Sequence, residues 1–213
     1  GAGKTFVSSN LAMSIAQTNK KVILVDVDIR KGTLSGIFSN SSKRMGLTHY
    51  LSGRTDGLDD IIGASEEYGK LDIIFSGPVP PNPAELLLSE RFDRLITELR
   101  KRYDYIIVDN VPAGMVADAS IVNRVADLTI FVVRSGIMDR RQLPELEKMY
   151  REEQLCNMCV VLNGVSYERR SYGYGYGYGY GYGYGYGYGN EHHGNNKQGV
   201  AKRIINKLIA FFK

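Results

Sequence analysis

The first residues of the chain have the composition of a loop that binds phosphate groups. They are Gly1, Ala2, Gly3, Lys4, Thr5 and Phe6, and the first five match the last five positions of the pattern G-x-x-x-x-G-K-[ST]. In such a loop the glycines let backbone N–H groups close around phosphates, the lysine neutralises the β- and γ-phosphate oxygens, and the threonine hydroxyl reaches Mg²⁺. These residues predict a site for ATP and Mg²⁺, since a glycine-rich end with an incidental lysine would leave the carboxylates described next unexplained.

Two apolar runs end in aspartates. Asp26 and Asp28 end the run 21–28, and Asp109 ends the run 105–109. Side chains two residues apart on a strand point to the same face, and two carboxylates there are costly without a cation such as Mg²⁺. Asp109 fits a carboxylate that holds the metal through water. The alternative is that these are solvated acids at strand ends, with Arg30 as a local partner.

Strands and helices must alternate to place these residues together. Apolar spacing predicts helices over 6–17, 83–103 and 140–154, and strands over 21–28, 105–109, 128–134 and 159–163. This alternation predicts an α/β fold, of the kind seen in P-loop NTPases, with a mostly parallel sheet covered by helices on both faces. Ligands bind at the carboxyl ends of the strands in such sheets, so both aspartate-ended strands aim their carboxylates at the binding edge.

The composition changes after residue 165, and we expect three parts: a catalytic domain over 1–165, a disordered tail over 166–199, and a basic amphipathic helix over 200–213. Tyr-Gly is repeated nine times in the tail, and glycine makes ordering costly. The tyrosines are Tyr172, Tyr174, Tyr176, Tyr178, Tyr180, Tyr182, Tyr184, Tyr186 and Tyr188. They predict either phosphate acceptors or a segment that self-associates. The terminal helix is equally suited to packing on the domain or to contacting a membrane surface.

Charge and composition exclude some functions. Residues 166–213 hold seven Lys/Arg and two Asp/Glu, whereas 1–165 hold 20 basic and 21 acidic residues, so the domain has no basic excess for nucleic acid. Cys156 and Cys159 lack further metal ligands nearby in sequence and are interpreted as packing thiols. The sequence contains no run of 18 or more apolar residues, so we predict no membrane span in it. The chain begins without Met inside the phosphate loop, so we expect it to be a fragment.

Four motifs together resemble the bacterial tyrosine kinases, the family of capsule and exopolysaccharide kinases. Residues 23–30 (ILVDVDIR) resemble the family's modified Walker A′ motif, and 109–112 (DNVP) resemble its Walker B pattern D-x-x-P. Residues 77–87 (GPVPPNPAELL) resemble its G-x-x-P-P-N-P-x-E-L-L segment, and 162–165 (LNGV) its closing strand. With the tyrosine cluster, the resemblance spans roughly residues 1–189 and is more specific than any one motif.

The resemblance implies an ATP-dependent protein-tyrosine kinase that phosphorylates its own tyrosine cluster, in trans, and regulates capsule or exopolysaccharide biosynthesis. It implies that Asp26 acts on the attacking tyrosine hydroxyl, either as the base or as a metal ligand, and that Asp28 supports it. It also implies that Asp109 completes the metal shell with Thr5 and Asp26. Asn163 is placed where relatives contact adenine, and Arg30 and Arg134 where they meet phosphates. Lys31-Gly32 depart from the basic residue and proline of many members, and Asn110 from the usual Thr or Ser.

The same resemblance implies partners and a location. We expect the chain to associate with itself, with a membrane adaptor that is fused upstream or separate, and with a protein tyrosine phosphatase, at the cytoplasmic face of the inner membrane and itself soluble. Two alternatives remain from the residues alone. One is a partitioning or division-site ATPase of the same fold, and the other is a scaffold that has lost nucleotide binding and associates through its tail.

Overall fold

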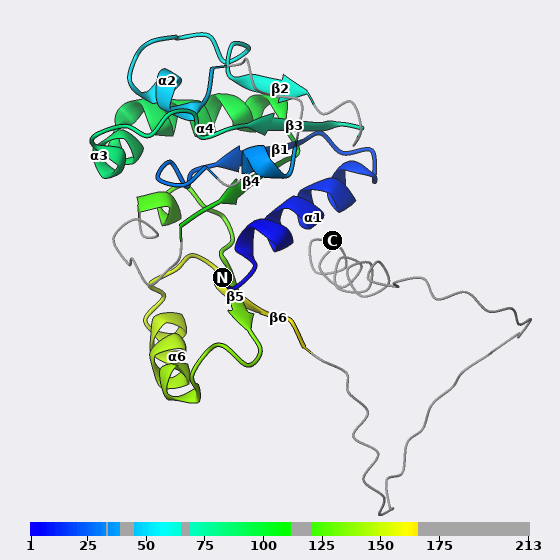
Figure 1. The fold of residues 1–213 in the computed structure, drawn as a ribbon, viewed down its shortest axis with the longest axis vertical. Helices are drawn as coiled ribbons and strands as arrows, with labels where there is room; N and C mark the ends of the chain where they lie inside the picture. The colour runs from blue at the N-terminus through cyan, green and yellow to red at the C-terminus, as the bar shows by residue number, and fades with distance from the viewer. Residues whose placement is uncertain (33, 39–44, 65–68, 112–120, 166–213) are drawn as a thin grey trace, which may run out of the picture. The chain divides into compact units, whose positions relative to one another are not determined.

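The computed structural model describes residues 1–32, 34–38, 45–64, 69–111 and 121–165. The chain divides into two compact units, Gly1–Gly164 and Val165–Lys213, and the first holds the helices and strands of the described residues (Figure 1). The predicted tail, its nine tyrosines and the predicted terminal helix lie outside the described residues.

Helices and strands alternate along the first unit, as the apolar spacing predicts. The helices are α1 (Lys4–Ala16), α2 (Leu47–Leu51), α3 (Pro83–Leu88), α4 (Glu90–Arg102) and α6 (Leu143–Arg151), with short 3₁₀ turns η1 (Leu34–Gly36) and η2 (Arg140–Gln142). The strands are β1 (Val22–Asp26), β2 (Ile62–Ala64), β3 (Leu71–Ile74), β4 (Tyr105–Asp109), β5 (Ile130–Arg134) and β6 (Cys159–Asn163). Among the described residues, none of these helices has the length and apolar character needed to cross a membrane.

The strands form two sheets. In the first, the order is β2-β3-β1-β4, with β1 parallel to both β3 and β4 and only β2 running antiparallel to β3. The register places Asp26 of β1 beside Asp109 of β4. In the second sheet β5 and β6 run parallel, so that Arg134 lies beside Asn163. The predicted mostly parallel α/β architecture is confirmed, and within the described residues it consists of these two sheets.

Helices cover both faces of the four-stranded sheet. All five residues of β1 are buried and alternate between the two faces. On one face they pack with Ala12 and Ala16 of α1. On the other they pack with Phe92, Leu95 and Leu99 of α4 and with parts of α2 and α3. Figure 1 shows α1 on one side of the sheet and α2, α3 and α4 on the other. The carboxyl ends of β1 and β4 are therefore held rigidly by a core on each side.

Several predicted boundaries were wrong. The helix expected over 83–103 is two helices, because Ser89 has an extended backbone (ψ 152°) and its hydroxyl donates to the Leu86 carbonyl at 2.6 Å. A continuous helix would align Leu88 with Phe92, whereas the break buries Leu87 and leaves Leu88 exposed. The helix expected over 140–154 is η2 followed by the shorter α6, and the strand expected over 21–28 ends at residue 26. The sequence patterns missed α2, β2 and β3.

Candidate active site

The phosphate loop leads directly into α1. Gly3 has φ of 90° and is the N-cap of α1, which has no side-chain cap hydrogen bond and no acidic residue in its first turn. This φ favours glycine, and a Cβ atom here would lie 2.2 Å from Asn163 Nδ2, so another residue would strain the backbone and displace the Asn163 side chain. The first N–H groups of a helix lack partners within the helix, and the helix dipole adds positive potential. This end of α1 is therefore suited to bind an anion such as phosphate.

Asp109, at the carboxyl end of β4, lies against this loop. It is only 2% exposed, and its carboxylate lies close to the hydroxyl groups of Thr5 and Ser8. Burial raises the pKa of Asp109, and the bonds to Thr5 and Ser8 and the charge of Lys4 oppose the rise. The structure thus brings together the loop lysine, the loop threonine and the carboxylate predicted to act with them.

Asp26, at the carboxyl end of the neighbouring strand β1, is fully buried. Its Oδ1 accepts the Asp28 N–H at 3.1 Å, and its Oδ2 accepts the Leu34 N–H at 3.3 Å. Burial raises the pKa of Asp26 from 3.8 to about 7, and the negative charges of Asp109 and Asp28 add to the rise that these two bonds partly oppose. A carboxyl with a pKa near the working pH is well suited to take a proton during catalysis.

Asp28 lies two residues beyond β1, where the chain has left the strand. It is 8% exposed, and its Oδ1 accepts the Lys31 N–H at 3.2 Å within a turn that closes at Gly32. Its charge acts on both Asp26 and Asp109 and raises the pKa of each. The three carboxylates predicted from the ends of two strands therefore share one electrostatic environment.

This environment fits a magnesium ion bound with a nucleotide. Within the ranges that the structure describes, no group of three or more His, Cys, Asp or Glu side chains forms a metal cluster. Mg²⁺ in phosphate-transfer sites uses one or two carboxylates and takes its other oxygens from phosphates and water. Asp26 and Asp109 are buried carboxylates whose pKa values are raised, so a divalent cation beside them would offset their charge.

The remaining predicted ligands of the nucleotide have different positions. Arg134 and Asn163 both reach the phosphate loop, where they donate to the carbonyls of Gly1 and Ala2 at 2.9 and 3.0 Å. Arg30 is exposed beyond β1, and the Phe6 side chain is 60% exposed on α1. The exposed ring of Phe6 is therefore not part of the hydrogen-bonded group around Asp109.

Two contributors to the site were missed in the sequence. Ser8, whose hydroxyl donates to the Thr5 carbonyl at 3.1 Å and lies near the Asp109 carboxylate, comes three residues after Thr5 and hence on the same side of α1. That spacing was a usable signal. The Leu34 N–H, which binds Asp26, comes from η1, and no residue type in the sequence indicates a backbone donor.

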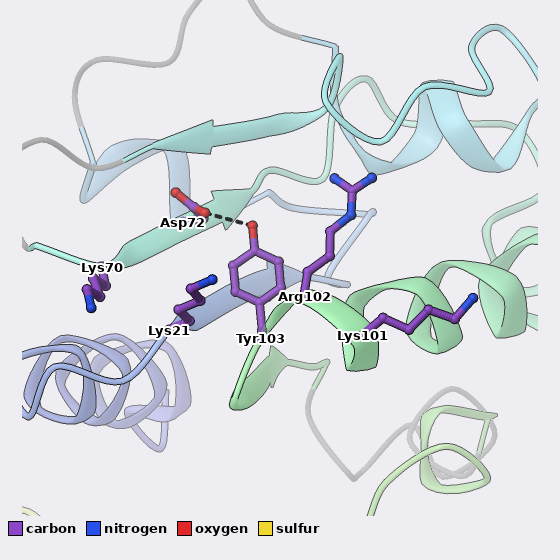
Figure 2. A pocket seen from close by; sticks show the side chains of 6 residues that line it. All are labelled: Lys21, Lys70, Asp72, Lys101, Arg102 and Tyr103. Atoms are coloured by element: carbon purple, nitrogen blue, oxygen red, sulfur yellow. Dashed lines mark hydrogen bonds between the residues drawn. The ribbon is translucent and has the colours of Figure 1, made fainter.

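A separate cavity lies near the amino ends of the strands, away from the carboxyl ends that carry the predicted site (Figure 2). Its volume is about 610 Å³, and it is lined by Lys21, Lys70, Asp72, Lys101, Arg102 and Tyr103. These residues precede or border the starts of β1, β3 and β4, whereas the carboxylates follow the strand ends. Asp72 accepts the Tyr103 hydroxyl at 2.7 Å, Arg102 pairs with Asp59 and Lys101 with Glu98. Much of the positive charge around this cavity is thus neutralised. None of the site residues predicted from the sequence lines the cavity.

Comparison with known proteins relates the chain to kinases. A family model described as an AAA domain matches residues 1–149. The chain is 37% identical to tyrosine-protein kinase CpsD of Streptococcus agalactiae serotype Ia over 173 residues. The aligned region covers 81% of this chain and 74% of that relative. It is 42% identical over 164 residues to a putative tyrosine-protein kinase in the cps region of Klebsiella pneumoniae, covering 77% of this chain and 22% of that relative.

Solved structures give the same relationship. The fold matches the kinase domain of the Escherichia coli tyrosine kinase ETK with a TM-score of 0.72 and 38% identity, covering 84% of this chain and 68% of that one. It also matches the septum site-determining protein MinD from Pyrococcus horikoshii, complexed with Mg-ADP, with a TM-score of 0.59 and 23% identity, covering 74% of this chain and 63% of that one. The second likeness concerns the fold alone.

Proposed function

The chain belongs to the bacterial tyrosine kinases and is a protein-tyrosine kinase, and on this premise we propose that it transfers the γ-phosphoryl group of ATP to the tyrosines of its own C-terminal segment. The observation that carries the proposal is the group formed by Lys4, Thr5 and Asp109, with the buried carboxyl of Asp26 at the neighbouring strand end. This group has the charges that phosphoryl transfer requires, since the protein mainly positions the phosphates and stabilises developing charge.

The phosphate loop binds the triphosphate in this proposal. The N–H groups that begin α1 face the phosphates, and Lys4 neutralises the β- and γ-phosphate oxygens. Thr5 and Asp109 would hold Mg²⁺ together with Asp26, and the ion would supply positive charge to the phosphoryl group being transferred. Two successive carbonyls of the loop accept hydrogen bonds from side chains at the ends of β5 and β6. These bonds leave the N–H groups of the loop available for the phosphates.

Asp26 takes the proton of the attacking tyrosine. A bond forms between the tyrosine hydroxyl oxygen and the γ-phosphorus, the bond from that phosphorus to the bridging oxygen of ADP breaks, and the phenol proton passes to the Asp26 carboxylate. A phenol has a pKa near 10, so the Asp26 carboxylate accepts its proton only late in the transfer, as the bond to phosphorus forms. A neighbouring Mg²⁺ would lower the pKa of Asp26 from the value of about 7 that burial gives it in the cation-free fold. Asp28 supports this role through its charge, which raises the pKa of Asp26.

The tyrosine cluster is the proposed substrate. It begins at Tyr172, nine residues after β6 ends at Asn163, and glycine alternates with each of the nine tyrosines. A glycine-rich segment of about 20 residues spans roughly 25 Å on average, which is enough to reach a neighbouring active site. We propose transfer between two copies, because a second copy can present its segment without a reversal of the chain next to its own phosphate loop.

The pathway and the partners of this kinase are also proposed from its relatives. A relative named for the cps region suggests a role in the biosynthesis and export of capsule or exopolysaccharide. A membrane adaptor, fused or separate, would bring the domain to the inner face of the membrane, and a phosphatase would reset the tyrosines. Each phosphate adds a charge of about −1.5 to −2, so the number of modified tyrosines would grade the response.

A mixing experiment tests the central proposal. The full chain is incubated with Mg-ATP and an isotope-labelled Lys4→Met copy, and phosphotyrosine is located by mass spectrometry. We expect phosphate on the labelled copy only when the unmodified copy is present. Phosphate on the unmodified copy alone would refute transfer between copies, and absence of phosphotyrosine from both copies would refute the kinase proposal itself.

A further inference from the structure

The last residues of β5 and β6 contact the phosphate loop through its carbonyl groups. Arg134 and Asn163 lie side by side in the parallel register of these strands. Arg134 Nη1 donates to the Gly1 carbonyl at 2.9 Å, and Asn163 Nδ2 donates to the Ala2 carbonyl at 3.0 Å. Two neighbouring strand ends thus bind two successive peptide groups of the loop.

We propose that Arg134 and Asn163 are positioning residues that hold the phosphate loop in its anion-binding conformation. The inference rests on the proposed function only in that the loop binds the phosphates of ATP. It differs from the roles implied by family resemblance, which are contact with phosphate for Arg134 and contact with adenine for Asn163.

The geometry of the peptide group explains how carbonyl contacts position the loop. In a planar trans peptide the C=O and N–H groups point in opposite directions. The Gly1 carbonyl shares its peptide with the Ala2 N–H, and the Ala2 carbonyl shares its peptide with the Gly3 N–H. A bond that holds each carbonyl toward the strand ends therefore turns the two N–H groups away from them. Two donors for phosphate are thereby fixed in direction before the ligand arrives.

Two glycines lie close to these side chains. A Cβ atom on Gly3 would lie 2.2 Å from Asn163 Nδ2. On the other side, Gly164 has φ of 70°, and a Cβ atom there would lie 3.4 Å from Arg134 Cγ. The Ser135 N–H donates to the Asn163 carbonyl at 2.8 Å and joins the two strand ends. Groups held on strand ends position their partners more accurately than groups on loops.

The same junction is where the proposed substrate segment begins. Gly164 packs against Arg134, and Val165 is the last residue before the tail predicted from the sequence.

Binding of a ligand without a base tests the inference. Full chains are titrated by calorimetry with Mg²⁺ complexes of ATP, GTP and inorganic tripolyphosphate. If Asn163 positions the loop, Asn163→Ala weakens all three ligands by a similar factor, about fivefold for one hydrogen bond, and the ratio of ATP to GTP affinity stays unchanged. A loss confined to ATP, with tripolyphosphate binding unchanged, would show that Asn163 contacts the base and would overturn the inference for this residue.

A charge-neutral variant tests Arg134. Gln keeps an N–H donor but removes the charge, so a positioning role predicts that Arg134→Gln binds all three ligands better than Arg134→Ala does. Equal weakness of the two variants would show that the charge is what matters and would overturn the inference for Arg134.

A matched control separates these effects from general weakening of β6. Asn157 Nδ2 donates to the Asp127 carbonyl at 2.8 Å just before the start of β6, so its bond has the same chemistry far from the loop. Asn157→Gly keeps the left-handed backbone at this position (φ 42°), and we expect it to leave the affinity for all three ligands unchanged. Equal weakening by Asn157→Gly would overturn the inference. If the unmodified chain binds none of the three ligands, the proposed function fails as well, whereas the other adverse outcomes remove the positioning role alone.

Discussion

Asp26→Asn separates the chemical role of this carboxyl from its effect on folding. Burial raises the pKa of Asp26 to about 7 from 3.8. Between these pH values the folded protein keeps a proton that the unfolded chain has lost. The free energy of unfolding therefore falls as pH rises through this window, because the unfolded state binds fewer protons than the folded state. Above pH 7 the full penalty of a buried, ionised carboxylate is present in the folded protein.

The size of the effect follows from the same values. One pKa unit corresponds to about 1.4 kcal/mol, so the penalty is about 4 kcal/mol at pH 8 and about 1.6 kcal/mol at pH 5. Asn removes the penalty but keeps one acceptor oxygen for the two N–H groups of Asp28 and Leu34, which costs about 2 kcal/mol. We therefore expect Asp26→Asn to be about 2 kcal/mol more stable than the unmodified chain at pH 8, a Tm increase of about 4–8 °C, and nearly equal at pH 5.

Thermal unfolding at pH 5 and pH 8, in EDTA and without nucleotide, measures this difference. Phosphotransfer by the same variant should fall by about 10²- to 10⁴-fold, the usual contribution of a general base. Asp59→Asn serves as the control, because Asp59 is an 87% exposed partner of Arg102 and should change Tm little at either pH. An equal loss of Tm at both pH values for Asp26→Asn would refute the reasoning, since it would mean that Asp26 is ionised in the fold without penalty.

Three further predictions concern the loop, the cation and the core. Gly3→Ala should lower the affinity for Mg-ATP at least tenfold in calorimetry, because φ of 90° and a Cβ position 2.2 Å from Asn163 Nδ2 force the loop to move; unchanged affinity would contradict this packing. Mg-ADP should raise Tm more at pH 8 than at pH 5, because the cation offsets Asp26 and Asp109 only when they are ionised; an equal shift would argue against a cation beside them. Arg124→Ala should cost about 3 kcal/mol in urea unfolding, because Arg124 donates to the Ile121 and Leu87 carbonyls at 2.6 and 2.9 Å. Arg124→Lys should recover little of this loss, because lysine lacks the planar fork of donors.

Short-range patterns in the sequence were enough to predict the fold class and the main elements. The strand limits 105–109 and 159–163 match β4 and β6, and the helix expected over 6–17 is α1 with its start moved to Lys4. The two strands are continuous runs of five mostly apolar residues, and α1 has apolar residues at helical spacing. The strands β2 and β3, of three and four residues, and the helix α2, of little more than one turn, were missed because so few positions do not establish a period.

The sequence by itself determined which residue types stand at strand and helix ends: a glycine–lysine turn before a helix, and carboxylates after apolar runs. Only the tertiary structure decided that β1 lies beside β4, so that Asp26 and Asp109 are neighbours, and that Asp26 is buried, which raises its pKa while the Leu34 N–H of η1 partly opposes the rise. It also decided that Asn163 and Arg134 bind loop carbonyls. The physical reason is that residue type and spacing act locally, whereas burial, strand order and backbone donors depend on segments brought together from far along the chain.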